Sequence, residues 1–260
     1  MILDAILKEK RRLLPLIKEK NPPELVRRRA LAGGRRPLDF AAALRVPGRL
    51  GIIAEVKKAS PSKGLIRDPF KPLEIAQAYQ SADVQALSVL TETEFFQGAP
   101  EYLAQIRAHC PLPLLRKDFI IDPYQIYEAY LLGADAVLLI AAVLEDGQLV
   151  EFSEIARSLG MQCLLEVHDQ AELERALGAG GTLLGVNNRN LKDFSEDLQT
   201  TARLAKQLPD TVTLVSESGV KNSRDLTFLK SCGADAALIG ESFMCKADIA
   251  AAVREMRGGS

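Results

Sequence analysis

The stretch Gly133-Ala-Asp-Ala-Val-Leu-Leu-Ile140 joins a turn signal to an uninterrupted apolar run. Short apolar runs of this kind are typical of parallel strands that are covered on both faces. Related turns stand at Ser81-Ala-Asp83, Gly180-Gly-Thr182 and Gly233-Ala-Asp235, so the four turns follow one another at intervals of 52, 47 and 53 residues. The spacing predicts a unit of two strands and two helices that occurs four times along the chain.

The residues of these turns have a structural explanation. The small residue is predicted to end the preceding helix in a left-handed backbone conformation, and the Asp is predicted to stabilise the tight turn into the strand. Because the turns precede strands, they lie at the end of the sheet opposite to the usual site of chemistry. We assign them no catalytic role.

Eight β-rich runs follow residue 50, and their starts lie about 20 to 35 residues apart, the length of one strand, one helix and two short loops. The predicted strands are Gly51–Val56, Ala86–Leu90, Leu112–Lys117, Ala136–Ile140, Gln162–Val167, Leu183–Asn187, Thr213–Glu217 and Ala236–Ile239. Eight units favour closure into an α/β (β/α)8 barrel, or TIM barrel, over an open doubly wound sheet. A length of 260 residues fits one such domain.

Residues 1–47 differ from the rest, because their apolar residues fall near helical spacing with Lys and Arg between them. We predict a helical extension over 1–47 and the barrel over 48–257, together one domain spanning 1–260. Pro15 interrupts the helical pattern and predicts a kink or a break, and Asn21-Pro-Pro23 predicts a stop followed by a new helix.

Composition excludes several classes of function. The net charge of −1 argues against bulk binding to nucleic acid or to an anionic membrane. The basic extension lacks the interleaved aromatic residues of an RNA-binding segment, so a solvated helix face is the better interpretation. The longest apolar run, Ala136–Leu144, is too short to cross a membrane. No obligatory protein partner is implied.

The cysteines and histidines give no sign of a metal or a cofactor. The four cysteines form no C-x-x-C pair, which predicts reduced, buried side chains in a reducing compartment. His109 and His168 lie far from zinc-ligand spacing, so no metal site is expected. Asp4 and several Lys and Arg residues replace the apolar core of a signal peptide, which predicts a cytoplasmic protein.

Charged residues stand at strand ends, where the site of a barrel forms. Glu55 and Lys57 are two residues apart and therefore share a face of their strand, which fits either a structural ion pair or a functional role. Lys117, Glu166 and Asn187 end later strands. Two neighbouring ammonium groups are expected to lower each other's pKa, so that a lysine can serve as an acid near neutral pH.

The seventh and eighth strands end in a different way. Ser218-Gly219 and Gly240-Glu241 place a glycine at each tip, where backbone N–H groups can approach an anion closely. This corner is the usual phosphate site of a barrel, and Ser60 and Lys57 adjoin it. The loop of residues 60–64 suits a mobile lid, and a rigid surface loop fits it almost as well.

Several motifs, in chain order, together resemble indole-3-glycerol phosphate synthase. They are Glu55-Val-Lys-Lys-Ala-Ser-Pro-Ser-Lys-Gly64, Lys117-Asp-Phe-Ile120, Asp122-Pro-Tyr-Gln-Ile126, Gly185-Val-Asn-Asn-Arg-Asn-Leu191 and Ser216-Glu-Ser-Gly219. The resemblance extends from the N-terminal segment, which corresponds to helices over the catalytic mouth in that family, to the last barrel unit. It implies ring closure, decarboxylation and dehydration of 1-(2-carboxyphenylamino)-1-deoxyribulose 5-phosphate, a step of tryptophan biosynthesis, without a cofactor.

The resemblance also implies catalytic roles. Lys117 is the expected acid for ring closure, because an alkoxide develops on the attacked carbonyl. Loss of water then needs an acid and a base, for which Glu166 and Lys57 are the candidates, and their division of labour is open. Glu55 and Asn187 are expected to hold hydroxyl groups or to position the lysines.

The remaining candidates are expected to bind the substrate. By the same resemblance, Arg189 faces the departing carboxylate, and Phe119 and Leu138 form walls for the aromatic ring. The residues expected around the phosphate are Ser60, Ser218, Gly219, Gly240 and Glu241. Glu241 is tolerable there if only its backbone contacts the ligand.

Two rival functions stay open at this point. One is another phosphosugar lyase, such as an aldolase that uses Lys117 or Lys57 as a Schiff base. Borohydride trapping with substrate would identify it, because ring closure leaves no covalent adduct. The other is a barrel that binds a phosphorylated ligand or a partner without catalysis, whose role would survive Lys117→Ala and Glu166→Gln.

Overall fold

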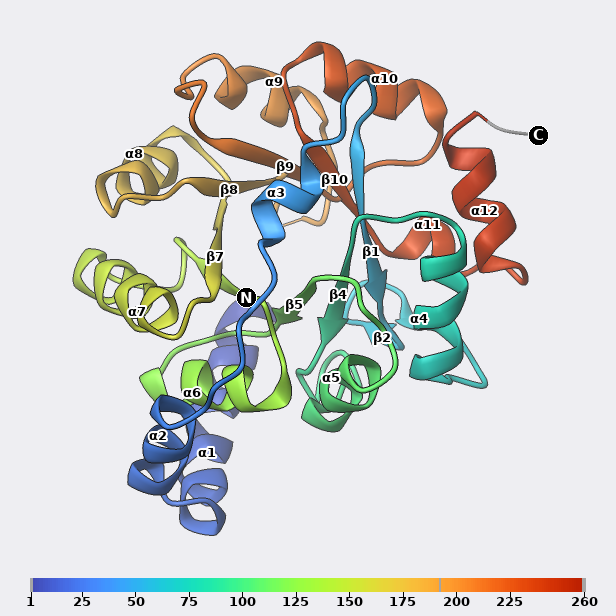
Figure 1. Cartoon of the computed structure of the whole chain (residues 1–260). Helices are drawn as coiled ribbons and strands as arrows, with labels where there is room; N and C mark the ends of the chain where they lie inside the picture. The colour runs from blue at the N-terminus through green and yellow to red at the C-terminus, as the bar shows by residue number, and fades with distance from the viewer. Residues whose placement is uncertain (1, 192, 259–260) are drawn as a thin grey trace.

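A closed parallel barrel surrounded by helices forms the body of the molecule (Figure 1). The computed structural model describes residues 2–191 and 193–258. The barrel strands, in the order in which neighbours pair, are β1 (Gly51–Val56), β10 (Ala236–Ile239), β9 (Thr213–Glu217), β8 (Leu183–Asn187), β7 (Gln162–Val167), β6 (Ala136–Ile140), β5 (Leu114–Lys117) and β4 (Ala86–Leu90). The first strand pairs with the last, with Gly51 opposite Ala236, so the sheet has no free edge. The predicted TIM barrel is therefore confirmed.

The helices alternate with these strands. The three N-terminal helices are α1 (Ile2–Lys20), α2 (Pro23–Leu31) and α3 (Phe40–Leu44). The helices that follow are α4 (Pro72–Ser81), α5 (Pro100–Arg107), α6 (Pro123–Leu132), α7 (Asp146–Ser158), α8 (Gln170–Gly178), α9 (Gln199–Ala205), α10 (Ser223–Ser231), α11 (Glu241–Met244) and α12 (Ile249–Met256). None of the described helices is long and apolar enough to cross a membrane.

Seven of the eight barrel strands have the predicted bounds. The exception is β5, which begins at Leu114 rather than at Leu112. Pro113 explains the later start, because a proline has no N–H to donate to the ladder. Its carbonyl still accepts the N–H of Leu87 at 2.9 Å, so the chain runs beside β4 before the strand begins.

Two apolar layers hold the barrel together. The larger one fills the space between the strands and the outer helices, and the smaller one fills the interior of the barrel. The side chains of Phe40 and Leu44, on the short helix α3, are completely buried in the interior layer. Figure 1 shows α3 across the barrel opening that faces the viewer. This helix therefore closes one end, which leaves the other end for a ligand.

Within the N-terminal extension, the helices α1 and α2 lie beside α6 (Figure 1). The break allowed for at Pro15 is absent, because α1 continues from Ile2 to Lys20. A proline inside a helix costs about 3 kcal/mol in isolation. Here Leu14 packs against Tyr124 of α6, and Lys18 forms an ion pair with Asp122 at 2.6 Å, so contacts on both sides of Pro15 hold the helix.

The turns before the even-numbered barrel units behave largely as expected. Gly133, Gly180 and Gly233 adopt positive φ values of 94°, 78° and 91°. In the first repeat the left-handed residue is Asp83 instead of the small residue, with φ of 60°, so the expectation was wrong there. The carboxylate of Asp135 accepts the N–H of Leu114 at 2.9 Å, which fixes the start of β5.

The loop after β1 is a small hairpin. Its strands are β2 (Ala59–Ser60) and β3 (Gly64–Leu65), which pair in antiparallel fashion. Gly64 has a φ of 66°, which turns the chain tightly where another residue would be strained. Arg67, just beyond β3, donates hydrogen bonds to the carbonyls of Met244 and Lys246 at 3.1 and 2.7 Å, which ties the hairpin to the loop after α11.

The four cysteines, at positions 110, 163, 232 and 245, are all free thiols. Their predicted burial is only partly correct. Cys110 is buried, whereas Cys245 is exposed at the end of the short helix α11. A four-residue helix at the rim of the barrel has too little packed surface to cover the residue that follows it.

Candidate active site

The candidate site is a cavity of about 470 Å³ at the carboxyl ends of the barrel strands. Its wall is mostly apolar, and the beginning of α1 contributes to it. The apolar residues that line it are Ile2, Leu3, Leu90, Phe96, Phe119, Leu138, Ile140, Leu191, Phe194, Val220, Leu238 and Ile239. Such a wall suits an aromatic group, and the polar residues described below are few enough to orient it.

All the residues singled out from the sequence line this one cavity. They are Glu55, Lys57, Ser60, Lys117, Phe119, Leu138, Glu166, Asn187, Arg189, Ser218, Gly219, Gly240 and Glu241. The strand-end rule therefore placed them correctly.

Lys117, the last residue of β5, lies between two carboxylates. Its Nζ is 2.9 Å from Glu166 Oε2 and 2.6 Å from Glu217 Oε2. Burial disfavours the ammonium, but the charges of Glu166, Glu217 and Glu55 outweigh it, so the pKa of Lys117 is raised. The expectation that a neighbouring lysine lowers the pKa of Lys117 was wrong, because carboxylates surround its ammonium.

Glu166 is the next-to-last residue of β7 and is almost fully buried. Besides Lys117, it accepts a hydrogen bond from Nδ2 of Asn187 at 3.1 Å. Burial opposes ionisation of Glu166, but the positive charges of Lys117 and His168 outweigh it and lower the pKa of its carboxyl group. Glu166 is therefore held as a carboxylate, ready to accept a proton.

Glu55 and Lys57 form an ion pair at 2.6 Å on the rim of β1. A side chain at position 240 would collide with this pair, because a Cβ built on Gly240 lies 2.3 Å from Glu55 Oε2 and 3.0 Å from Lys57 Nζ. The glycine at the tip of β10 therefore makes room for the carboxylate of its neighbour strand. That role is independent of any contact with phosphate.

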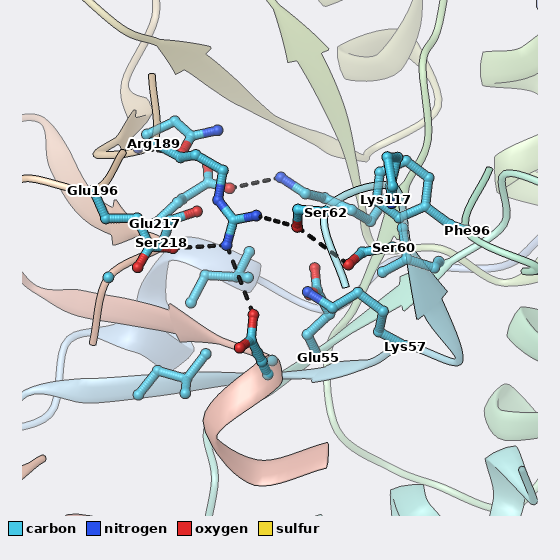
Figure 2. A pocket seen from close by; sticks show the side chains of 18 of the residues that line it. Glu55, Lys57, Ser60, Ser62, Phe96, Lys117, Arg189, Glu196, Glu217 and Ser218 are labelled. Carbon is cyan, nitrogen blue, oxygen red and sulfur yellow. Dashed lines mark hydrogen bonds and ion pairs between the residues drawn. The ribbon is translucent and has the colours of Figure 1, made fainter. Parts of the chain in front are cut away.

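Arg189 links the hairpin to the loop after β8 (Figure 2). Its guanidinium donates to Ser62 Oγ at 2.8 Å and to Glu196 Oε1 at 2.6 Å. It also lies 3.9 Å from Glu241, whose other carboxylate oxygen is 3.1 Å from Lys63. The hairpin is thus connected through Ser62 to the loop after β8 and through Lys63 to the start of α11.

The residues just after β9 and β10 form one corner of the cavity, where two consecutive residues have an uncommon backbone conformation. Ser218 and Gly219 are consecutive residues with positive φ, 66° and 85°. Successive left-handed residues turn backbone N–H groups toward one side, which makes a concave surface for an anion. The buried Ser60 of β2 and Gly240 line the same cavity, so hydroxyl and backbone groups surround this corner.

A sequence profile described as indole-3-glycerol phosphate synthase matches residues 3–256. The chain belongs to the indole-3-glycerol phosphate synthase family. Three relatives that carry this name come from Acetivibrio thermocellus (54% identical, covering 86% of each chain), Roseiflexus (49%, 100% of this chain and 99% of the relative) and Caldanaerobacter subterraneus (48%, 100% of both). The similarity covers both the extension and the barrel.

Solved structures of other proteins resemble this synthase family member in fold alone. A 3-hexulose-6-phosphate synthase from Salmonella typhimurium has a TM-score of 0.66 at 15% identity, covering 80% of this chain and 97% of its own. An N-acetylmannosamine-6-phosphate 2-epimerase from Clostridium perfringens has a TM-score of 0.60 at 13% identity, covering 81% and 93%. At such identities only the barrel is shared.

One residue of this synthase family site escaped the sequence reasoning. Glu217, the last residue of β9, is buried and contacts Lys117 directly, while its Oε1 has no hydrogen-bond partner among the described residues. Burial raises the pKa of Glu217, because the ammonium of Lys117 does not offset burial together with the like charge of Glu166. Its position at a strand end, like that of Lys117, was the available signal.

Gly185 explains how Glu217 fits. A Cβ built on Gly185 lies 2.1 Å from Glu217 Oε1, so the missing side chain on β8 is the space that the carboxylate occupies. Gly185 pairs with Val215 and Asn187 with Glu217 across the two strands. Within residues 2–191 and 193–258, no three His, Cys, Asp or Glu side chains are grouped as a metal site requires.

Proposed function

We propose that the chain catalyses the reaction of its family. It converts 1-(2-carboxyphenylamino)-1-deoxyribulose 5-phosphate into indole-3-glycerol phosphate, carbon dioxide and water. The observation that carries the proposal is the Lys117 ammonium, held between Glu166 and Glu217 in an apolar-walled cavity of a chain that belongs to the family throughout its length. A proton donor, a proton acceptor and a wall for an aromatic ring stand in one place.

In the first step a ring carbon attacks the ribulose carbonyl and negative charge develops on its oxygen. Lys117 donates a proton to that oxygen, so an alcohol forms and the lysine becomes neutral. The raised pKa of Lys117 keeps the donor charged until the substrate oxygen becomes basic. Glu217 and Glu166 hold the ammonium at the centre of the cavity, which limits its motion before the transfer.

Decarboxylation follows, because the ring carbon that attacked the carbonyl still carries the carboxylate. The carbon–carbon bond to the carboxylate breaks, carbon dioxide leaves, and the electron pair restores the aromatic ring. Arg189 lines the cavity and provides the positive charge that orients the carboxylate before it leaves. Phe119 and Leu138 provide apolar walls beside the ring.

Dehydration completes the pyrrole ring and needs an acid and a base. Lys57 is the proposed acid, since its ammonium reaches the cavity and its partner Glu55 holds it there at 2.6 Å. It protonates the departing hydroxyl group, which leaves as water. Glu166 is the proposed base, because it is held ionised beside the cavity centre, and it removes the proton from the adjacent carbon. Asn187 orients that carboxylate through its 3.1 Å hydrogen bond.

The phosphate is placed at the corner between β9, β10 and the hairpin. Ser218, Gly219 and Gly240 offer backbone N–H groups, and Ser60 offers a hydroxyl. Glu241 contributes only its backbone, because its carboxylate is directed to Lys63 at 3.1 Å.

We further propose that the extension and the barrel form one domain that works in the cytoplasm. Ile2 and Leu3 of the extension line the same cavity as the barrel residues, which supports one functional unit. The four free thiols are compatible with a reducing compartment. The proton transfers described use side chains of this chain alone, so no cofactor or partner is required for them.

The test uses the absence of tryptophan from the chain. Indole fluorescence should grow when the protein is mixed with the carboxyphenylamino-deoxyribulose phosphate, with little background from the protein itself. Lys117→Ala should lower kcat by roughly 10² to 10⁴-fold, the usual contribution of a positioned acid. Lys71→Ala, the same change on an exposed lysine of α4, should leave kcat unchanged. A flat trace from folded wild-type protein with authentic substrate would refute the assignment.

The aldolase alternative gains no support from the geometry. A Schiff base needs a neutral amine, whereas Lys117 is held as an ammonium by two carboxylates and its pKa is raised. Borohydride added during turnover is therefore expected to leave the protein mass unchanged. A stable adduct on Lys117 or Lys57 would favour the aldolase.

A further inference from the structure

A line of three side chains leads from the candidate base to the surface. Nδ1 of His168 lies 3.0 Å from Glu172 Oε2, and Nε2 of the same ring lies 3.4 Å from Glu166 Oε1. His168 follows β7 directly and shares a face with Glu166, two residues earlier. Glu172 lies in the first turn of α8, whose beginning is fixed by the Asp169 side chain, which accepts the N–H of Glu172.

The contacts determine which atoms of the imidazole carry hydrogen. Glu172 also accepts the backbone N–H of His168 at 2.8 Å, which holds the ring beside that carboxylate. A carboxylate only accepts hydrogen bonds when ionised, so Nδ1 is the donor to Glu172. In a neutral ring Nε2 would then present a lone pair to Glu166. Only the protonated ring donates at both ends.

The charge of the surroundings favours that protonated ring. Burial disfavours the imidazolium, but the hydrogen bond to Glu172 and the charges of Glu166, Glu172 and Glu217 outweigh it, so the pKa of His168 is raised. Nε2 is buried and has no hydrogen-bond partner within residues 2–191 and 193–258. The ring is therefore directed at Glu166 at a distance that a small shift of either side chain closes.

We propose that His168 is a positioning residue that holds Glu166 as a carboxylate through the reaction, with Glu172 fixing the ring. The inference rests on the proposed function, in which Lys117 gives its proton to the substrate during ring closure. From that moment the neutral lysine no longer stabilises Glu166. His168 then supplies the positive charge that keeps Glu166 ionised for the later proton removal.

The groups that face Glu166 determine the pH at which its carboxylate becomes protonated. Lys117 approaches from β5, Asn187 from β8 and His168 from its own strand, while Glu217 approaches through the shared lysine. Of these, His168 is the cation that is not consumed in the proposed first step. Its loss is expected to raise the pH at which Glu166 becomes protonated, whereas loss of a neutral packing side chain is expected to lower the rate equally at every pH.

The first experiment follows the histidines by NMR and does not depend on activity. The chain has two histidines, so His109, on the surface beyond α5, serves as the internal reference for His168. The His168 ring is expected to titrate above the usual value of about 6.5 in the wild type, and at lower pH in Glu172→Gln. A His168 pKa at or below the usual value, insensitive to Glu172→Gln, would overturn the proposal.

The second experiment measures kcat across pH for His168→Asn, Glu172→Gln and the control His109→Asn. For His168→Asn we expect the acidic limb to move up by about one pH unit, a tenfold loss of kcat at acid pH, and convergence with the wild type above the pKa of His168. Glu172→Gln should move the limb in the same direction by less, and His109→Asn should not move it.

The two experiments separate failure of this proposal from failure of the proposed function. If the wild type turned over no substrate, the NMR titration would still report whether His168 is charged between the two carboxylates. If the enzyme is active and His168→Asn lowers kcat equally at all pH values, the residue is only structural and the proposal is wrong.

Discussion

At the scale of single residues, the carboxylates of the site occupy space that glycines on neighbouring strands leave free. Glu217 lies where a side chain of Gly185 would stand, and Glu55 lies where one of Gly240 would stand. Neither glycine has a positive φ, so their conformation does not require glycine. Glycine is required at these positions because a carboxylate of the neighbouring strand occupies the space that a side chain would fill.

Gly185→Ala is therefore expected to displace Glu217 and, with it, Lys117. The added Cβ would lie 2.1 Å from Glu217 Oε1 in the present arrangement, so the carboxylate has to move. Misplacement of a catalytic group by about 1 Å can cost roughly 10²-fold, and we expect a loss of kcat of that order in the fluorescence assay. Gly147→Ala, on α7 with open space around it, is the matched control, and an equal loss in both variants would contradict the explanation.

The residues that sequence reasoning missed or misjudged depend on such neighbours. Lys117 and Glu166 were found because a charged residue at a strand end is visible in one strand alone. The fit of Glu217 beside Gly185 and the raised pKa of Lys117 depend on which strand ends lie side by side around the barrel. That information lies in the register between β5, β7, β8 and β9, which no single strand displays.

At the scale of elements, α1 is fixed to the strand that carries the proposed acid. Lys10 of α1 lies 2.6 Å from Asp118, the residue directly after Lys117, and the Asp118 side chain is completely buried. Asp118 also accepts hydrogen bonds from Thr91 at 2.7 Å and from Arg116 at 3.2 Å. The helix α1, whose first residues line the cavity, is thus attached beside Lys117.

Lys10→Met is expected to lower the free energy of unfolding at neutral pH by roughly 1.5–3 kcal/mol, the value of a hydrogen bond to a charged group. Burial disfavours the Asp118 carboxylate, but Lys10 and Arg116 outweigh it and lower its pKa. A lowered folded-state pKa gives stability above the unfolded-state pKa that is lost as pH falls through the folded-state pKa. In urea unfolding, the difference in the free energy of unfolding between Lys10→Met and the wild type should therefore become smaller as the pH falls.

The exposed Lys8, on the same helix, supplies the control for this measurement. Lys8→Met should leave the free energy of unfolding nearly unchanged, as is usual for surface substitutions. A difference between Lys10→Met and the wild type that stayed constant down to acid pH would show that the ion pair with Asp118 is not its source.

The strands could be predicted from the sequence where their apolar run was long enough to be recognised. The barrel strands are buried on both faces, so an apolar run marks both ends of each strand except β5, whose start is displaced by Pro113. The strands β2 and β3 have two residues each, which is too short for any periodicity to show. The helix α1 continues through Pro15 without the break that was one of the two expectations, and its contacts with Tyr124 and Asp122 lie more than 100 residues away along the chain.

At the scale of the whole molecule, Asp135 joins three parts of the chain. Its carboxylate accepts hydrogen bonds from Arg35 at 2.9 Å and from the N–H of Leu38 at 2.9 Å in the extension, and from Arg107 at 2.7 Å at the end of α5. It also fixes the first residue of β5. The Asp was predicted as a turn residue in each repeat, and in this repeat it also connects the extension, α5 and β5.

A comparison of equivalent positions tests this role. Asp235, in the same place of the last repeat, accepts the N–H of Leu214 at 2.8 Å and lies 3.9 Å from Arg45. Asp135→Ala is expected to lower the free energy of unfolding by roughly 3–5 kcal/mol, because it removes four hydrogen bonds to one carboxylate, two of them from guanidinium groups, and Asp235→Ala by about 1 kcal/mol. Equal losses in denaturant unfolding would show that the extension contacts add nothing.

The pairing of β1 with β10 also has a consequence for how the chain is made. A ribosome releases Gly51 early and Ala236 only near the end of synthesis, so the nascent sheet keeps two open edges for most of translation. The basic extension emerges first and waits for acidic partners at positions 118, 122 and 135 that follow about 100 residues later. Neutralisation of the extension can therefore precede closure, and the open sheet edges need chaperone protection until β10 has emerged.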